Sequence, residues 1–404
     1  MTFSRSDTPP PGSVAQPASP RQSVTPAGAV WKAPTPRKPV SAAFVIGTIA
    51  LCVLSFLFLL VLGYVMLSIG PTAALVCGVI ALIPLTVVLL VVRLIDRWEP
   101  EPRGALWFAF LWGAAASVAL ALLVDAGVQI LVYAASDGQA VPSDVFGAVI
   151  QAPLVEESAK GFGVLLIFLV LRRTFDGPVD GLVYAATVAG GFAFTENILY
   201  FGSSLIEGGG VSLGVTFALR GIMGPFAHVM FTSCTGIALG FASRRRGFWP
   251  VAGLFLLGLL CAMILHALWN GTTVVADGIE GFLAAYAVIQ VPLFALAIVG
   301  VVLLRRAEVR ATRARLAEYA AAGWFVPAEV DMLATGQGRR SARAWARSQP
   351  VPKTAVMRAF IRDATALAFT RQRLITGRDH IGIQRQEAEL LAAVASDRAA
   401  LLSG

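Results

Sequence analysis

The chain has 404 residues, of which 57% are hydrophobic and only 14% are charged. Soluble proteins carry about a quarter charged residues, so this composition, with a mean hydropathy of +0.74, excludes a soluble enzyme or binding module and indicates an integral membrane protein. The net charge of +8 is concentrated at the ends: residues 1–40 carry five Lys and Arg against one Asp, and residues 305–404 carry 17 against nine Asp and Glu.

Residues 1–40 are rich in Pro, Ser, Thr and Ala and contain no apolar stretch. This composition predicts a disordered basic tail, and without an apolar segment of its own the tail does not have the pattern of a cleavable signal peptide. Basic segments beside a membrane are typical of contact with anionic headgroups. We therefore expect the lipid bilayer as a partner and no nucleic acid.

Eight apolar stretches of membrane-spanning length lie between residues 41 and 304. A helix that crosses a bilayer needs about 20 mostly apolar residues. We therefore expect an all-α polytopic bundle of about eight transmembrane helices, over residues 42–67, 71–92, 104–134, 145–170, 179–201, 211–242, 250–271 and 279–304. The Gly224–Pro225 pair predicts a kink inside the sixth.

The positions of Lys and Arg between these stretches predict how the chain is oriented. Arginines lie in the connections after the second, fourth and sixth stretches: Arg93, Arg97, Arg103, Arg172, Arg173, Arg244, Arg245 and Arg246. The alternate connections, including the one near residues 202–210, contain no Lys or Arg. Because cytoplasmic loops carry the excess of these residues, we expect a multi-pass cell-membrane protein with both termini in the cytoplasm.

Residues 305–404 predict a small basic helical cytoplasmic domain, with helices expected near 316–325, 327–334, 355–374 and 386–402. We expect its single histidine, His380, to be exposed to solvent. The four cysteines, Cys52, Cys77, Cys234 and Cys261, lie in apolar stretches without paired spacing. They predict small buried hydrophobic side chains and neither disulfides nor a zinc site.

The fourth apolar stretch carries Glu156, Glu157 and Lys160 near its middle. Each charge at mid-helix costs roughly 2.5–3.5 kcal/mol on insertion scales, so the three cost on the order of 8–10 kcal/mol. Lys160 can pair with either carboxylate, at spacings of four and three residues, and leave the other free for general-base work. The segment therefore predicts chemistry or ion movement, although a lone Glu–Lys pair is equally compatible with helix packing.

Four other apolar stretches also carry polar residues. In chain order, the third stretch carries Asp125, the fifth Glu196, Asn197 and Tyr200, the sixth Arg220, His228 and Thr232, and the seventh His266 and Asn270. Asp125 fits a structural hydrogen bond or a site role equally well. Arg220 is expected near the outer surface with its charge extended toward water.

His228 and His266 are each followed, one turn later, by a hydroxyl or amide residue able to orient the ring or stabilise an oxyanion. Two imidazoles and a carboxylate, with a water, are typical of catalytic zinc. Either histidine alone is explained more simply by an interhelical hydrogen bond. Together with Glu156 and Glu196, they favour a catalytic site, with zinc as a candidate cofactor.

Four of these segments resemble the motifs of the PrsW family of intramembrane metalloproteases: EESAK at 156–160, GFAFTENILY at 191–200, HVMFT at 228–232 and HALWN at 266–270. DGLVYA at 180–185 resembles the lead-in to the second motif. The resemblance covers about residues 140–275. It implies a bacterial peptidase that cuts membrane proteins within or close to the bilayer, and the family is associated with cleavage of an anti-sigma factor. It also implies a place in the CAAX-protease and Abi-like superfamily.

By position, the resemblance assigns Glu156 and Glu157 to the paired acids of the family and Lys160 to its basic residue. Glu196 and Asn197 fall in the second motif, His228 in the third, and His266 with Asn270 in the fourth. These positions predict that Glu156 deprotonates a water held by the histidines, directly or through zinc, and that Asn270 stabilises the oxyanion. The chain lacks HExxH, which leaves a metal-free glutamate mechanism open.

Two other functions remain alternatives. A catalytically silent scaffold or chaperone of the same fold predicts that replacing Glu156 leaves the cell phenotype intact. A proton-coupled transporter also uses acids and a Lys inside the membrane. It is the less favoured alternative, because such transporters often show internal repeats and the sequence shows no second EExxK-like segment.

Overall fold

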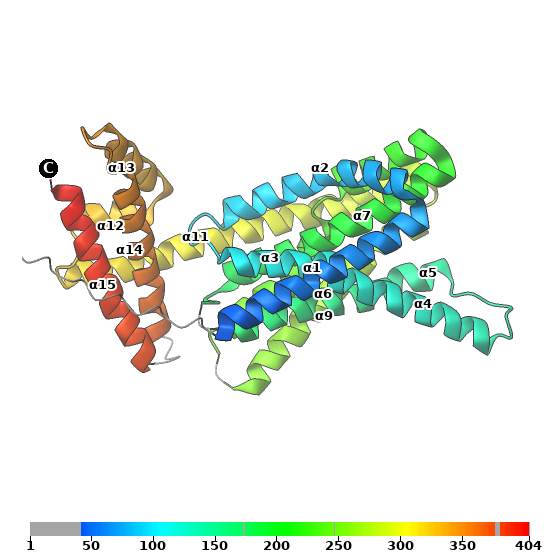
Figure 1. The fold of residues 1–404 in the computed structure, drawn as a ribbon, viewed down its shortest axis with the longest axis horizontal. Helices are drawn as coiled ribbons and strands as arrows, with labels where there is room; N and C mark the ends of the chain where they lie inside the picture. Colours follow the sequence, from blue (N-terminus) through cyan, green and yellow to red (C-terminus); the bar gives the residue numbers. More distant parts are fainter. Residues whose placement is uncertain (1–41, 173, 246, 376–379, 404) are drawn as a thin grey trace, which may run out of the picture. The chain divides into compact units, whose positions relative to one another are not determined.

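The computed structural model describes residues 42–403, except 173, 246 and 376–379. The predicted disordered tail of residues 1–40 lies outside the described residues, as does the side chain of His380. All regular structure in the described part is helical, as the sequence predicts (Figure 1).

The helices lie on the predicted apolar stretches, but α7 (Pro178–Phe217) joins the fifth of them to the start of the sixth. The helices are α1 (Ala42–Ile69), α2 (Pro71–Ile95), α3 (Arg103–Leu111), α4 (Val118–Ala135), α5 (Asp144–Phe146), α6 (Ala152–Val170), α7 (Pro178–Phe217), α8 (Ala227–Ala242), α9 (Phe248–Val275), α10 (Gly278–Ala285), α11 (Val291–Ala321), α12 (Pro327–Ala334), α13 (Gly336–Ser348), α14 (Thr354–Ile375) and α15 (His380–Leu402). Four π-helical turns join consecutive helices, at Trp112–Ser117, Gly147–Gln151, Ala218–Met223 and Tyr286–Gln290.

Six stretches among the described residues are long and apolar enough to cross a membrane, which supports a multi-pass membrane protein. They are Phe44–Ile69, Pro71–Ile95, Arg103–Ala135, Pro178–Ala242, Phe248–Val274 and Gly278–Ala321. The stretch Pro178–Ala242 has 65 residues, far more than one crossing needs. α6, which carries three charged residues, is not among the six stretches. The count of eight spans stays a prediction.

The connection expected near residues 202–210 is largely helical, because α7 continues to Phe217. The chain changes direction at Gly209, whose φ of 66° and ψ of −157° interrupt the helix; only glycine adopts this backbone conformation readily. The predicted kink at Gly224–Pro225 is confirmed as a break between Met223 and Ala227.

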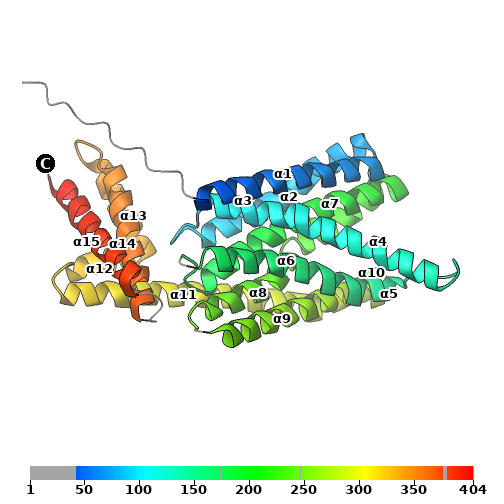
Figure 2. The same cartoon turned by 60° about the horizontal axis from the view of Figure 1, so that its bottom comes forward.

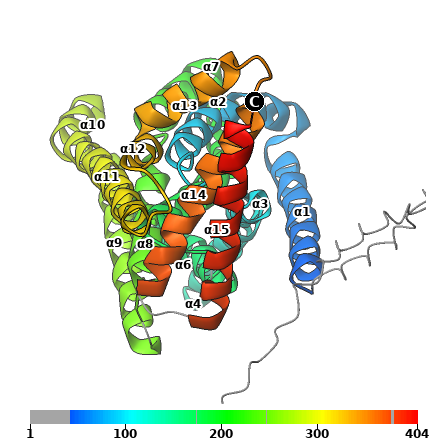
Figure 3. The ribbon, with the colours of Figure 1, turned by 90° about the vertical axis from the view of Figure 1, so that its left-hand side faces the viewer.

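α7 is the central helix of the membrane body and packs against α2, α3, α6 and α8. Gly181 of α7 and Gly236 of α8 allow the two backbones to meet, since a Cβ on either glycine would overlap the carbonyl oxygen of the other. α6 packs against both helices of this pair, and α9 runs beside α6 and α8 (Figure 2). α1 lies at the outer edge of the bundle (Figure 3), and only 11% of its apolar window is buried.

The last four helices and the C-terminal end of α11 form a bundle with its own apolar core. Its fully buried side chains include Leu316, Leu333, Ala346, Ala364 and Leu367. α11 enters this bundle without a break. The boundary expected at Arg305, between the last apolar stretch and the cytoplasmic domain, therefore lies inside one continuous helix. α13 was not among the predicted helices: Gly336 and Gly338 looked like breaks, but Thr335 caps the helix by accepting a hydrogen bond from the N–H of Gly338.

The loop between α2 and α3 connects this bundle to the membrane body. The guanidinium of Arg339, on α13, stacks 3.4 Å from the centre of the Trp98 ring and donates to the Trp98 carbonyl oxygen at 3.3 Å. Farther along the loop, buried Glu101 accepts a hydrogen bond of 2.6 Å from the hydroxyl of Tyr184, on α7. Burial raises the pKa of Glu101 to about 9, and the nearby charge of Asp180 adds to this effect.

The raised pKa of Glu101 makes the folded state less stable at high pH. Since the pKa is 4.5 without these interactions and about 9 in the fold, protonated Glu101 stabilises the fold fully only at low pH, and this contribution is lost as the pH rises through about 9. We expect the melting temperature of the detergent-solubilised protein to fall between about pH 5 and pH 9. Glu101→Gln, which can still accept from Tyr184, should flatten the profile; two parallel profiles would contradict the prediction.

Candidate active site

α6 places three charged side chains against its neighbours. The ammonium of Lys160 lies 2.6 Å from Glu157 Oε1 and 3.3 Å from Glu156 Oε2. It is also 4.0 Å from the centre of the Phe192 ring. Lys160 and Glu157 are completely buried, whereas Glu156 is 9% exposed. The sequence left open which carboxylate pairs with Lys160; both do, and Glu156 is the one that keeps contact with open space.

Glu157 has partners on two other helices. Its Oε2 accepts a hydrogen bond of 2.8 Å from Thr232, on α8, and its Oε1 lies 3.1 Å from His266 Nδ1, on α9. Thr232 was expected to orient His228 or an oxyanion, and it binds Glu157 instead. Glu157 therefore links α6, α8 and α9 and orients His266.

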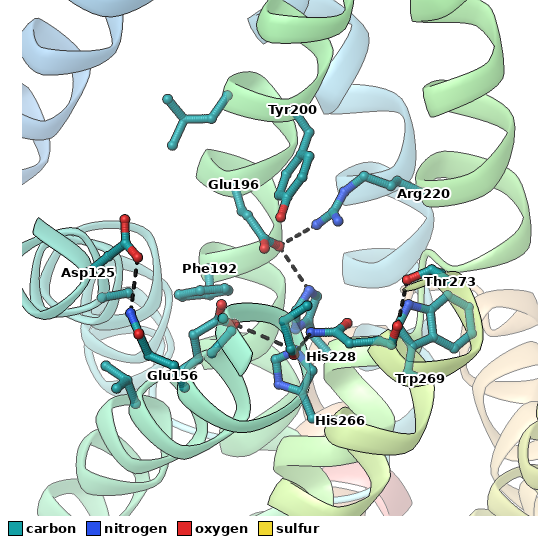
Figure 4. A pocket seen from close by; sticks show the side chains of 18 of the residues that line it. Asp125, Glu156, Phe192, Glu196, Tyr200, Arg220, His228, His266, Trp269 and Thr273 are labelled. Atoms are coloured by element: carbon teal, nitrogen blue, oxygen red, sulfur yellow. Dashed lines mark hydrogen bonds and ion pairs between the residues drawn. The ribbon is translucent and has the colours of Figure 1, made fainter. Parts of the chain in front are cut away.

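Glu196, on α7, lies between a guanidinium and an imidazole (Figure 4). It pairs with Arg220 Nη2 and with His228 Nε2, the latter at 2.9 Å. Arg220 also donates from Nε to Asn197 Oδ1 at 2.9 Å and stacks over the ring of Tyr200 at 4.0 Å. The expectation that Arg220 extends toward water is wrong, because its charge is neutralised by Glu196 inside the bundle.

The partners of the two histidines indicate which ring nitrogens carry a proton. A carboxylate accepts hydrogen bonds only, so His266 donates from Nδ1 to Glu157 and directs its other nitrogen, Nε2, away from Glu157. That atom lies 3.9 Å from Glu156 Oε2. His228 donates from Nε2 to Glu196, and its Nδ1 accepts from Lys160 Nζ at 3.2 Å. The two rings meet edge to face, with centres 5.2 Å apart.

These side chains open into a cavity of about 610 Å³. Its polar lining includes Asp125, Gln151, Glu156, Glu196, Arg220, His228, His266 and Asn270, and its apolar lining includes Val118, Leu122, Val155, Leu199 and Trp269. An apolar cavity with a few convergent polar groups is typical of a binding site.

Two further predicted residues line the cavity and have partners there. Asn270 donates from Nδ2 to the carbonyl oxygen of Ala148 at 2.8 Å, in the π-helical turn before α6. Asp125 accepts from Gln129 at 2.7 Å and from Gln151 at 3.0 Å, so both of its oxygens are engaged. Asp125 therefore has the structural hydrogen bonds that were one of its two expected roles.

The charges of the site do not balance. Around the histidines, three carboxylates, Glu156, Glu157 and Glu196, face two cations, Lys160 and Arg220. When both histidines are neutral this leaves one negative charge, in addition to that of Asp125 in the same cavity. Burying an uncompensated charge is expensive, so the site favours either a proton on a carboxylate or a bound cation.

The donor set fits a divalent metal. Glu156, His228 and His266 each offer a ligand atom, and these atoms lie within 4.8 Å of one another. Glu157 and Glu196 bind the other nitrogens of the two imidazoles, as carboxylates do behind zinc-bound histidines. Both nitrogens of His228 already have partners, so its use as a ligand requires that one of these contacts opens.

Comparison with known proteins shows which family this part of the chain is similar to. Residues 101–297 match the model of the PrsW family intramembrane metalloproteases. Protease PrsW of Geobacillus kaustophilus (strain HTA426) is 32% identical over 164 residues, which cover 40% of this chain and 65% of that protein. The same-named proteins of Clostridioides difficile (strain 630) and Bacillus subtilis (strain 168) are 28% identical over 197 residues and 27% over 183, covering 47% and 43% of this chain and 76% of each relative.

No solved structure matches the chain. The matched segment contains all four motifs and every helix that contributes to the cavity. Residues 101–297 of this chain are therefore similar to the PrsW family of intramembrane metalloproteases, and the chain covers just under two thirds of the relative from Geobacillus kaustophilus.

Proposed function

We propose that this protein is an intramembrane protease that hydrolyses peptide bonds of membrane-protein substrates at the cavity between α6, α7, α8 and α9. The observation that carries the proposal is the meeting of Glu156, His228 and His266 within 4.8 Å at the wall of that cavity. Hydrolysis inside a bilayer needs a base, a way to hold water and space for the substrate backbone, and the site supplies all three.

In the proposed mechanism Glu156 is the general base. It removes a proton from the water whose oxygen attacks the scissile carbonyl carbon, and it then delivers that proton to the leaving amine. Lys160, at 3.3 Å, holds its carboxylate in place. Glu157 cannot take this role because Lys160, Thr232 and His266 occupy its oxygens.

The remaining side chains orient water and carbonyl. His266, with its Nδ1 bound to Glu157, directs Nε2 toward Glu156. Asn270 carries two N–H groups on Nδ2, and only one is needed for Ala148, so the other is available to an oxyanion. We assign Arg220 and Asn197 to positioning Glu196, which in turn orients His228.

A divalent metal, for which zinc is our candidate, would be held by His228 and His266, whose ligand atoms lie within 4.8 Å of a Glu156 oxygen, and Glu156 would keep its role as the base. When bound, such an ion supplies Lewis-acid polarisation of water and carbonyl. It would also neutralise the residual negative charge of the site.

The substrate class we propose is a membrane-protein segment that enters from the lipid. Val118, Leu122, Val155 and Leu199 give the cavity apolar walls that suit such a segment. An anti-sigma factor, implied by the family resemblance, is the first candidate. The arginine-rich connections are assigned to the cytoplasm, so that both termini lie there.

The test is a quantitative comparison of membrane proteins from cells that express either the wild-type protein or Glu156→Gln. We expect one full-length membrane protein to accumulate only with the variant, and the purified wild-type protein in liposomes to cut it. Unchanged membrane proteins, with equal amounts of both forms in the membrane, would favour the scaffold alternative. A proton flux in wild-type liposomes, lost in the variant, would favour the transporter.

Arg220 provides a prediction about positioning. Arg220→Lys keeps the positive charge near Glu196 but loses the planar guanidinium, whose Nε also donates to Asn197. Loss of such a supporting contact costs about 10–100-fold in activity, so we expect cleavage of the identified substrate to slow by that factor while the melting temperature changes little. A cleavage rate equal to that of the wild type would contradict the assignment of Arg220 to positioning Glu196.

A further inference from the structure

The outer face of α13 and its surroundings carry five arginines that we call the arginine stripe: Arg97, Arg340, Arg343, Arg347 and Arg358. The α13 members are spaced by three and four residues, which puts them on one side of the helix. Ala342 and Ala346, on the adjacent side, are buried against the C-terminal bundle. All members of the stripe except the half-buried Arg343 are exposed.

No carboxylate neutralises the stripe within the described part of the chain. None of its arginines takes part in a described ion pair, whereas Arg313, Arg362 and Arg385 of the same bundle pair with acids. Burial lowers the pKa of Arg343, and the other four arginines of the stripe lower it further. A concentration of like charges of this kind attracts anions of opposite charge.

The position of the stripe indicates the source of that anion. Arg97 follows the last residue of the spanning helix α2, Ile95, by two residues. Arg339 anchors α13 on Trp98, which lies three residues past Ile95. Three extended residues reach about 10 Å at most, and the headgroup layer is roughly 5–8 Å thick on each side of the hydrocarbon core. The contact with Trp98 therefore keeps α13 close to the membrane surface at the end of α2.

We propose that the arginine stripe binds the anionic headgroups of the membrane in which the protein is embedded, with phosphate oxygens as the bound groups. A cluster of four to eight basic residues directly beside a spanning helix is the usual recognition element for such lipids. Guanidinium groups bind phosphate through two parallel hydrogen bonds. Trp345, 44% exposed on the same helix, adds an aromatic ring of the kind enriched at membrane interfaces. A nucleic acid also carries phosphate groups, but the position of the stripe beside the end of the spanning helix α2 favours a membrane lipid.

The test uses the full-length protein, delipidated in neutral detergent and titrated with phosphatidylglycerol or phosphatidylcholine under native mass spectrometry. The stripe variant is Arg340→Gln/Arg343→Gln/Arg347→Gln. The matched control, Arg313→Gln/Arg362→Gln/Arg385→Gln, loses the same charge from arginines that already have carboxylate partners. We expect the stripe variant to lose on the order of a hundredfold in phosphatidylglycerol affinity, and the control to stay close to the wild type.

Hydrogen exchange locates the bound lipid. In nanodiscs, amides of residues 336–348 should exchange more slowly when phosphatidylglycerol is present than in phosphatidylcholine alone, and this difference should vanish in the stripe variant. Equal losses of phosphatidylglycerol affinity in the two triple variants would overturn the proposal. Equal exchange rates of residues 336–348 with and without phosphatidylglycerol would also overturn it. So would stripe-dependent binding of an oligonucleotide without any lipid preference.

Discussion

Glu156→Gln is expected to abolish proteolysis while leaving the protein folded. The amide has nearly the same shape and still accepts a hydrogen bond from Lys160, but it cannot take a proton from water. Loss of a general base costs about 10²–10⁴-fold, and we expect the upper end because Glu156 is the carboxylate of the Glu156–Glu157 pair that reaches the cavity. Cleavage of the substrate by protein reconstituted in liposomes measures this loss.

The control for this prediction is the adjacent acid. Glu157→Gln removes the same charge from the same turn of α6, yet its side chain is completely buried and bound to Thr232 and His266. It should lower the melting temperature more than Glu156→Gln does, and it should leave more residual activity per folded molecule. If Glu157→Gln were the inactive variant and Glu156→Gln the active one, the roles assigned to the two acids would be reversed.

Lys160→Met is expected to produce the largest loss of stability of any single change in the site. It removes the cation that neutralises Glu156 and Glu157, and breaking a buried ion pair by removing one partner costs about 3–5 kcal/mol. Because the change also frees Nδ1 of His228, zinc should raise the melting temperature of the variant more than that of the wild-type protein. Differential scanning fluorimetry with and without zinc measures both effects.

A double variant separates charge balance from loss of packing. Lys160→Met/Glu157→Gln removes one positive and one negative charge, so it should regain much of the stability lost in Lys160→Met alone. A double variant less stable than either single variant would contradict the electrostatic explanation and assign the loss to the space around Lys160.

The sequence was sufficient for the helical stretches of the membrane body and for most residues that line the cavity, while the count of eight spans stays a prediction. Runs of about 20 apolar residues have few alternatives to a membrane helix, but α7 joins the fifth predicted stretch to the start of the sixth. Spacings of three and four residues identified Lys160 as the partner of the α6 acids. The meeting of α6, α7, α8 and α9 followed from the cost of leaving so many polar groups unpaired in lipid.

The features that the sequence did not predict depend on contacts between residues far apart in the chain. Arg220 was placed near the surface by counting residues along one straight helix, but the π-helical turn Ala218–Met223 and the break before Ala227 return its side chain to Glu196. The partner of Asn270 is a carbonyl 122 residues away in the chain. α13 contains few apolar residues to mark it as a helix, because the side chains it buries are two alanines and Arg339.

The continuity of α11 couples movement in the membrane to the far end of the molecule. At 1.5 Å per residue its 31 residues reach about 46 Å, and they contain no proline beyond the first turn and no break that would act as a hinge. A tilt of about 10° in the lipid-embedded half would displace the opposite tip by roughly 8 Å, enough to pull Arg339 off the Trp98 ring. Rearrangement of the spans during substrate entry would thus be transmitted as a swing of the terminal helices.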